Sequence, residues 1–144
     1  MTSLQVEAPA YMTEDLRIFE DGVAKFLERE AVPNNERYIA QHGVDRSLWN
    51  KAGEAGLLCA SMPEEYGGAG GTFAHEAVIN RAFSLAGFDS FGGALHSGIV
   101  APYILHYGSE QQKRRCAWHR ATGACCNIDY CNAHRMRRRT RLAN

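Results

Sequence analysis

The chain has 144 residues, 45% of them apolar, and its 16 basic and 16 acidic side chains give a formal net charge of zero. That balance hides a step: residues 1–112 hold 7 basic against 15 acidic side chains (net −8), whereas residues 113–144 hold 9 against 1 (net +8). The length predicts one domain with a real core. No apolar run reaches the roughly 18 residues of a bilayer span, and the N-terminus lacks the pattern of a secretory signal. We therefore expect a cytoplasmic protein outside membranes.

The first half of the chain predicts a loose arm followed by three helices. Residues 1–10 show no periodicity. Thr13 is a suitable N-cap for a helix that ends before Pro33, because polar side chains cap free amides and the residue before proline disfavours helix. A short helix over 38–42 should end at Gly43. Asp45 is the expected N-cap of the next helix, with an apolar face of Leu48, Trp49, Ala52 and Ala55 and a stop at Gly56.

A buried connector over 57–60 and a glycine-rich loop over 63–71 should follow. Thr72 then caps a helix that ends at Gly87, with apolar positions Phe73, Ala77, Val78, Ala82 and Leu85. The segment from Leu95 to Tyr107 is apolar on more than one face, which predicts a central, buried helix in which Pro102 causes a kink or an offset start. Ser109 to Gln112 fits a capping box that opens a last helix.

No strand pattern competes with these helices. The fold class is therefore all-α, a helical bundle of four to five main helices with an irregular basic C-terminal tail. No internal repeat is evident.

Three pieces of the chain, in this order, resemble the N-terminal domain of the acyl-CoA dehydrogenase family. They are Trp49–Leu57, the loop Met62–Gly71 with its Pro-x-x-Tyr-Gly-Gly-x-Gly pattern, and His96–Pro102 followed by Tyr107–Lys113 with its Gly-Ser-x-x-Gln-Lys pattern. The resemblance implies the fold of that helical domain over residues 11–115, after a loose N-terminal arm over 1–10. Residues 116–144 form a Cys- and Arg-rich tail outside the family pattern, which we expect to be disordered.

The resemblance also implies a chemistry. Members of the family are oxidoreductases that bind FAD and remove two hydrogens from the α and β carbons of an acyl-CoA thioester, with a carboxylate as base. In full length they are homo-oligomers. The family's flavin-contacting stretch of the type Thr-Glu-Pro-x-x-Gly-Ser-Asp is absent from this sequence. We therefore expect no flavin-binding residue, no catalytic residue and no retained FAD here, and whether this chain is itself an enzyme stays open.

The acidic residues present have the pattern of solvated faces, so none of Glu14, Glu28, Glu54 and Glu76 is expected to be the base. By position in the family, the helical domain supplies one wall of the acyl-chain pocket, and the residues that match that wall are Ser90, Phe91, Ala94, Leu95 and Gly98. The alternative for each of these residues is helix–helix packing. The partner implied by the family is the acyl-CoA substrate.

The tail beyond Arg115 allows several interpretations. A shift of reading frame explains the step in charge, the crowding of Cys116, Cys125, Cys126 and Cys131, and the early stop together, and it is the interpretation we prefer. A zinc site is disfavoured because no Cys-x-x-Cys pair is present, so no metal is expected. A basic arm for nucleic acid or a membrane surface has few aromatic residues for base stacking, and we do not expect nucleic-acid binding.

Two functional classes follow from these observations. In the preferred one, the chain is the N-terminal part of an acyl-CoA dehydrogenase, cut off after about residue 115 and inactive alone. In the alternative, it is a stand-alone helical interaction module, with or without a basic tail that binds nucleic acid or a membrane.

Overall fold

The computed structural model describes residues 9–114, and in this range every regular element is helical, as predicted. The first helix, α1 (Glu14–Phe26), continues through a π-helical turn, η1 (Leu27–Ala31), into the 3₁₀ turn η2 (Val32–Asn34). Thr13 is its N-cap and accepts a hydrogen bond at 3.4 Å from the backbone N–H of Leu16. The regular helix thus ends at Pro33, where the sequence predicted it would.

The two short helices that follow differ in detail from the sequence prediction. Helix α2 spans Asn35–Ala40 and so begins and ends earlier than the predicted 38–42. Helix α3 (Arg46–Glu54) has Asp45 at its N-cap position, but that carboxylate makes no cap hydrogen bond. It binds instead the guanidinium of Arg37 at 2.6 Å and the amide of Gln41 at 3.1 Å. Asp45 therefore ties α3 to α2, because an ion pair with an arginine is a stronger contact than a neutral cap.

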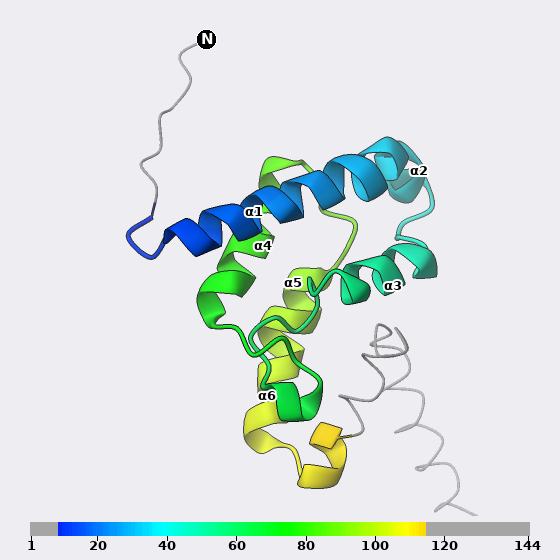
Figure 1. Ribbon diagram of the computed structural model, residues 1–144. Helices are drawn as coiled ribbons and strands as arrows, with labels where there is room; N and C mark the ends of the chain where they lie inside the picture. Colours follow the sequence, from blue (N-terminus) through cyan, green and yellow to red (C-terminus); the bar gives the residue numbers. More distant parts are fainter. Residues whose placement is uncertain (1–8, 115–144) are drawn as a thin grey trace, which may run out of the picture.

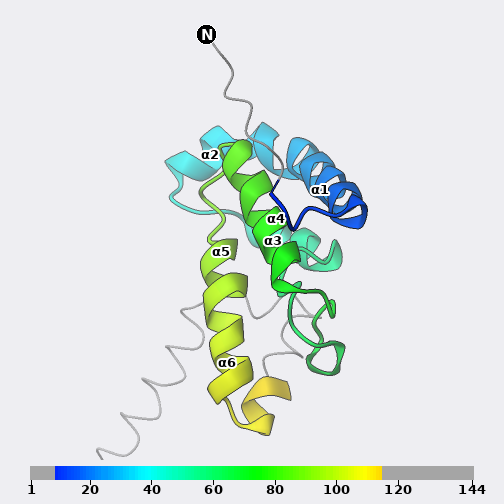
Figure 2. The same ribbon diagram turned by 90° about the vertical axis from the view of Figure 1, so that its left-hand side faces the viewer.

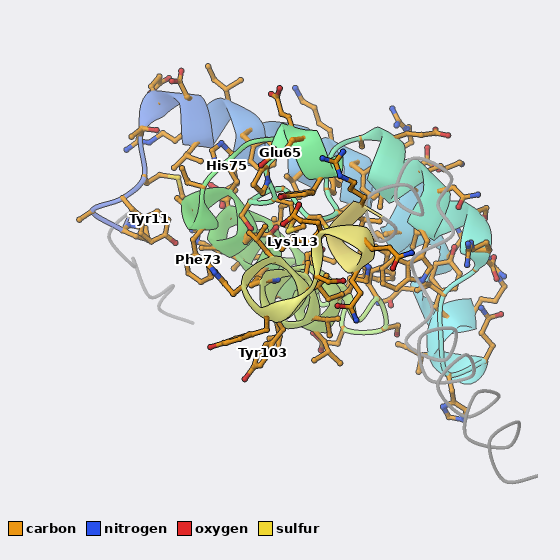
Figure 3. All side chains as sticks on the ribbon, turned by 90° about the horizontal axis from the view of Figure 1, so that it is seen from below. Tyr11, Glu65, Phe73, His75, Tyr103 and Lys113 are labelled. Carbon is orange, nitrogen blue, oxygen red and sulfur yellow. The ribbon has the colours of Figure 1, made fainter. Side chains whose placement is uncertain are left out.

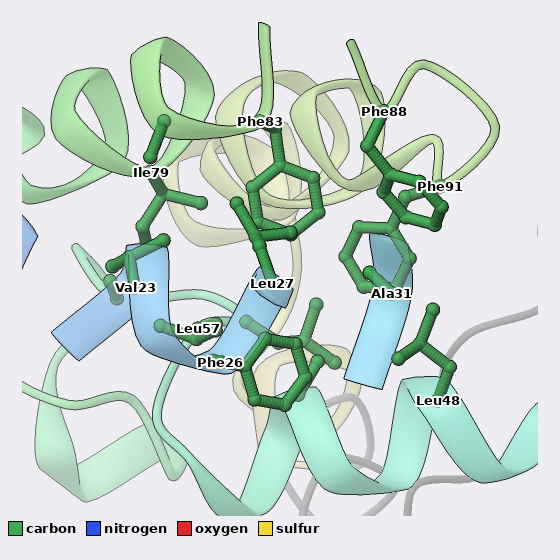
Figure 4. Packing of buried hydrophobic residues seen from close by; sticks show 14 of the residues in the cluster. Val23, Phe26, Leu27, Ala31, Leu48, Leu57, Ile79, Phe83, Phe88 and Phe91 are labelled. Carbon is green, nitrogen blue, oxygen red and sulfur yellow. The ribbon is translucent and has the colours of Figure 1, made fainter. Parts of the chain in front are cut away.

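The core lies between α1 with η1 on one side and α4 (Phe73–Leu85) on the other (Figure 4). Helix α1 and η1 contribute side chains that are at most 6% exposed, and α4 contributes Ile79 and Phe83. Helix α3 and the connector after it close the core from below with Leu48 and Leu57 (Figure 4). The connector over 57–60 is buried as predicted, and Gly56 ends α3 with a φ of +72°, a conformation that favours glycine.

The last third of the domain is a rod made of α5 (Gly93–Leu95), the π-helical turn η4 (His96–Val100) and α6 (Ala101–Tyr107), stacked end to end (Figure 2). Pro102 is in the first turn of α6, and the wider turn η4 precedes it, so the predicted offset start is confirmed. The rod leads away from the layer formed by α1 and α2 (Figure 1). It ends at Gly108, and a further turn begins at Glu110 behind the predicted capping box of Ser109 and Gln112.

The prediction that this helix is central and buried is wrong. Only three of its residues, His96, Ser97 and Ala101, are buried. Its large apolar residues are exposed at 45%, 52%, 65% and 83%: Leu95, Ile99, Tyr103 and Tyr107. The rod packs through its upper part against α4 and leaves one long side open. On α4 itself, Phe73 and Leu85 were predicted as apolar face positions but are 73% and 71% exposed. No helix among residues 9–114 is long and apolar enough to cross a membrane.

Candidate functional site

The site predicted from the sequence lies at the turn before α5 and along the start of the rod. The structure places its five residues at different depths. Ala94 and Leu95 are exposed, Ser90 and Gly98 are half-buried, and Phe91 is only 3% exposed. Four of the five predicted residues can therefore be reached from outside the described domain, and one belongs to its interior.

Phe91 anchors the start of the rod in an aromatic cluster. Its ring stacks on Trp49 of α3 with centroids 4.1 Å apart and on Phe83 of α4 with centroids 5.1 Å apart. Stacked aromatic rings at these distances contribute beyond their buried area. Phe91 thus fixes the position of the turn that carries Ser90 and the helix that carries Ala94.

Gly98 does not owe its lack of a side chain to close packing. A Cβ atom built at residue 98 would have one neighbour within 4 Å, the side-chain nitrogen of Asn80 at 4.0 Å, which is an ordinary contact distance. Helix–helix packing among residues 9–114 therefore does not require glycine at this position. The space beside Gly98 is open to whatever lies against this side of the rod.

Polar contacts that the sequence did not predict hold the inner side of the rod. Ser97 Oγ accepts a hydrogen bond at 2.9 Å from the backbone N–H of Cys59 and lies 3.2 Å from Nδ1 of His96. The ring of His96 meets Trp49 edge-on, with centroids 5.7 Å apart. Cys59 has a φ of +53°, unusual for a residue with a side chain, and its amide is satisfied by Ser97 in that conformation. The rod and the connector therefore determine each other's geometry.

The glycine-rich loop is folded on itself. The backbone N–H groups of its glycines donate to carbonyls of the same loop or connector: Gly67 to Glu64, Gly68 to Pro63, Gly70 to Met62 and Gly71 to Ala60. A Cβ at residue 68 would lie 1.7 Å from the carbonyl oxygen of Met62. A phosphate-binding loop needs free amides that point at the anion. This loop has spent four of them on its own backbone, so it does not fit the diphosphate of a dinucleotide.

A three-residue clasp joins this loop to the turn that begins at Glu110. Tyr66 Oη donates to one carboxylate oxygen of Glu110 at 2.9 Å, and Lys113 Nζ donates to the other at 2.9 Å. The Lys113 ammonium also lies 5.6 Å from the centre of the Tyr66 ring. Lys113 and Tyr66 lower the pKa of the Glu110 carboxyl, and Glu110 in turn raises the pKa of Lys113 and of the Tyr66 hydroxyl. The clasp physically connects two of the sequence motifs.

Glu76 is the one buried carboxylate among the four acids considered from the sequence, whereas Glu14, Glu28 and Glu54 are exposed. Its side chain is 2% exposed and accepts hydrogen bonds from the backbone N–H and the hydroxyl of Ser61, at 3.1 and 3.3 Å. This pairing is structural: Glu76 fixes the connector against α4. No cluster of metal-ligating side chains occurs among residues 9–114, and the tail cysteines considered for zinc lie outside the described residues.

Comparisons with known proteins agree with the fold and the motifs. Residues 13–124 match the family model described as acyl-CoA dehydrogenase, N-terminal domain. A long-chain specific acyl-CoA dehydrogenase of Sus scrofa mitochondria is 36% identical over 108 residues, which is 75% of this chain and 25% of that protein. A probable acyl-CoA dehydrogenase of Bacillus subtilis is 35% identical over 113 residues, which is 77% of this chain and 19% of that protein.

Solved structures give the same result. The crystal structure of acyl-CoA dehydrogenase from Geobacillus kaustophilus superposes with a TM-score of 0.75 and 38% identity, over 81% of this chain and 30% of that one. The enzyme from Bacillus anthracis, crystallised with FAD, gives 0.70 and 35%, over 83% and 21%. The present chain thus spans about a quarter of the length of the curated relatives it matches. Its fold, its motifs and these matches show that it belongs to the acyl-CoA dehydrogenase family, to whose N-terminal helical domain residues 13–124 correspond.

Proposed function

We propose that this chain serves as the N-terminal domain in the FAD-dependent α,β-dehydrogenation of an acyl-CoA thioester, and that it supplies one wall of the acyl pocket. The observation that carries the proposal is the open side of the rod. There Ser90, Ala94 and Leu95 can be reached from outside, and the space beside Gly98 is not used by the domain itself. Side chains of this size leave room for an apolar chain to lie along the helix.

Phe91 takes a different part in this proposal. Because it is stacked between Trp49 and Phe83, it supports the wall from behind and does not line it. The flavin and the carboxylate base come from parts of the enzyme other than residues 9–114. The glycine-rich loop has no spare amides for a diphosphate, and the buried acid, Glu76, is held by Ser61. When bound, FAD accepts the hydride.

Partners and location follow from the same proposal. The partners are the acyl-CoA substrate and, in an assembled enzyme, further copies of the subunit. We place the protein in the cytoplasm because its first 30 residues lack the pattern of a secretory signal. The mammalian relatives are mitochondrial by name.

The test is a chimera in which residues 13–114 replace the matching segment of the Geobacillus kaustophilus enzyme. An active chimera is expected to bind FAD. Ala94→Phe in it should lower kcat/KM for long acyl chains at least about tenfold more than for short ones, since a ring on the wall shortens the pocket. Ala40→Phe, at an exposed position on α2, is the matched control and should leave the chain-length profile unchanged. Equal effects of the two substitutions on all chain lengths would refute the wall.

The chain on its own provides a second check. Purified protein should be colourless and should not oxidise acyl-CoA. A yellow preparation with bound flavin and dehydrogenase activity would show that this chain holds more of the active site than we propose.

A further inference from the structure

The open side of the rod carries a continuous apolar stripe that we define as Leu95, Ile99, Tyr103 and Tyr107. These residues follow one another at intervals of four, so their side chains lie on one side of a helical rod. They are 45–83% exposed, with exposure rising toward the C-terminal end. Tyr103 points away from the rest of the molecule, on a different side of α6 from Lys113 (Figure 3). The two tyrosine rings are 5.6 Å apart and form one aromatic surface.

We propose that this stripe is a dimerisation surface at which two copies of the chain pack their rods antiparallel. In a two-fold symmetric interface each residue meets a counterpart across the axis. With the axis between Ile99 and Tyr103, the aliphatic end of one stripe covers the aromatic end of the other. The inference goes beyond the proposed function and does not depend on it, because it rests only on the exposed side of the rod.

The charge pattern favours a second copy as the occupant. Residues 93–107 contain no Lys, Arg, Asp or Glu. Their two histidines, His96 and His106, lie respectively in the interior and on the surface. A two-fold axis brings identical groups together, so a charge beside it would repel itself. The centres of protein interfaces are depleted of charge and enriched in tyrosine, which is the composition of this stripe.

The available area suits a weak dimer. Aromatic side chains bury roughly 150–250 Å² each, so two copies of two largely exposed tyrosines offer on the order of 600 Å². Leu95 and Ile99 bring the total to about 1,000 Å², the lower limit of a specific interface. We therefore expect dissociation constants in the micromolar range or weaker.

Sedimentation equilibrium of the 144-residue chain over about 5 to 500 μM tests this proposal. The weight-average mass should rise with concentration from 16.0 kDa toward twice that value and no further. Tyr103→Ser with Tyr107→Ser should weaken the dimer at least about thirtyfold, as expected for hot-spot residues. The control is Ile18→Ser with Ile39→Ser, which removes two residues of 65% and 58% exposure on α1 and α2 and should leave the dimer unchanged. Circular dichroism checks that both variants keep their helices.

Salt separates this interface from an electrostatic one, because the halves of the chain with net charges of −8 and +8 could also attract each other. A charge-free interface should keep its dissociation constant within about twofold between roughly 0.05 and 0.5 M salt. A monomer at all concentrations would overturn the proposal. So would a dimer that dissolves in salt, masses that grow past twice 16.0 kDa, or equal losses in the stripe variant and the control.

Discussion

Replacing Glu76 gives a sharp test of how the domain is held together. Its carboxylate is 2% exposed, and one of its oxygens accepts both hydrogen bonds from Ser61, at 3.1 and 3.3 Å. Hydrogen bonds to a charged group contribute about 1.5–3 kcal/mol each, and leaving a buried N–H without a partner costs about 1–3 kcal/mol. Glu76→Ala should therefore lower the free energy of unfolding by about 3–5 kcal/mol, once the small cavity is included.

Glu76→Gln separates hydrogen bonding from charge. The amide oxygen of glutamine can accept from both Ser61 groups, so we expect this variant to lose no more than about 1.5 kcal/mol. Ser61→Ala removes the hydroxyl but keeps the backbone N–H, and a double-mutant cycle with Glu76→Ala should give a coupling of about 1 kcal/mol.

Urea unfolding followed by circular dichroism measures these differences. Glu54→Ala, at an exposed acid on α3, is the control and should change stability by less than about 0.5 kcal/mol. If the glutamine variant is as unstable as the alanine variant, or if the alanine variant loses less than about 1 kcal/mol, the pairing with Ser61 is not what holds the connector.

Two further predictions concern the loop and its clasp. Gly68→Ala should melt far below the wild type, because its Cβ would lie 1.7 Å from the carbonyl oxygen of Met62, whereas Gly43→Ala, with nothing within 4 Å, should not. The lowered pKa of Glu110 means that its contribution to stability is complete above the ordinary carboxyl pKa and is lost as the pH falls through the lower folded value. The Tm difference between wild type and Glu110→Gln should therefore shrink as the pH falls below about 4.5, and a constant difference would show that Glu110 stabilises the clasp without its charge.

The limits of the helices were largely predictable because they depend on local chemistry. Thr13 caps α1, Gly56 and Gly108 end their helices, and Ser109 opens the last turn, each within a few residues of the element concerned. Asp45 is the exception among the caps. A distant arginine, Arg37, takes its carboxylate, and no local pattern reveals such a competitor.

What covers each helix could not be predicted in the same way. Periodicity shows that a residue is apolar and on a given side, but it does not show whether another element lies there. Phe73 and the stripe on the rod are apolar and largely exposed because nothing else in residues 9–114 packs on them. The contacts that fix the site have the same origin: Cys59 and Ser97 are 38 residues apart, and Tyr66 and Glu110 are 44.

The glycines show what the structure adds to the proposed function. In the sequence, Gly68 and Gly98 are alike, each inside a motif shared with the family. In the structure, the backbone of the loop itself excludes a side chain at residue 68, whereas nothing in the described domain excludes one at residue 98. A glycine inside a helix costs about 1 kcal/mol relative to alanine, so its presence there calls for a benefit elsewhere. The benefit we infer is room beside the rod, on the side where the proposal places the acyl chain.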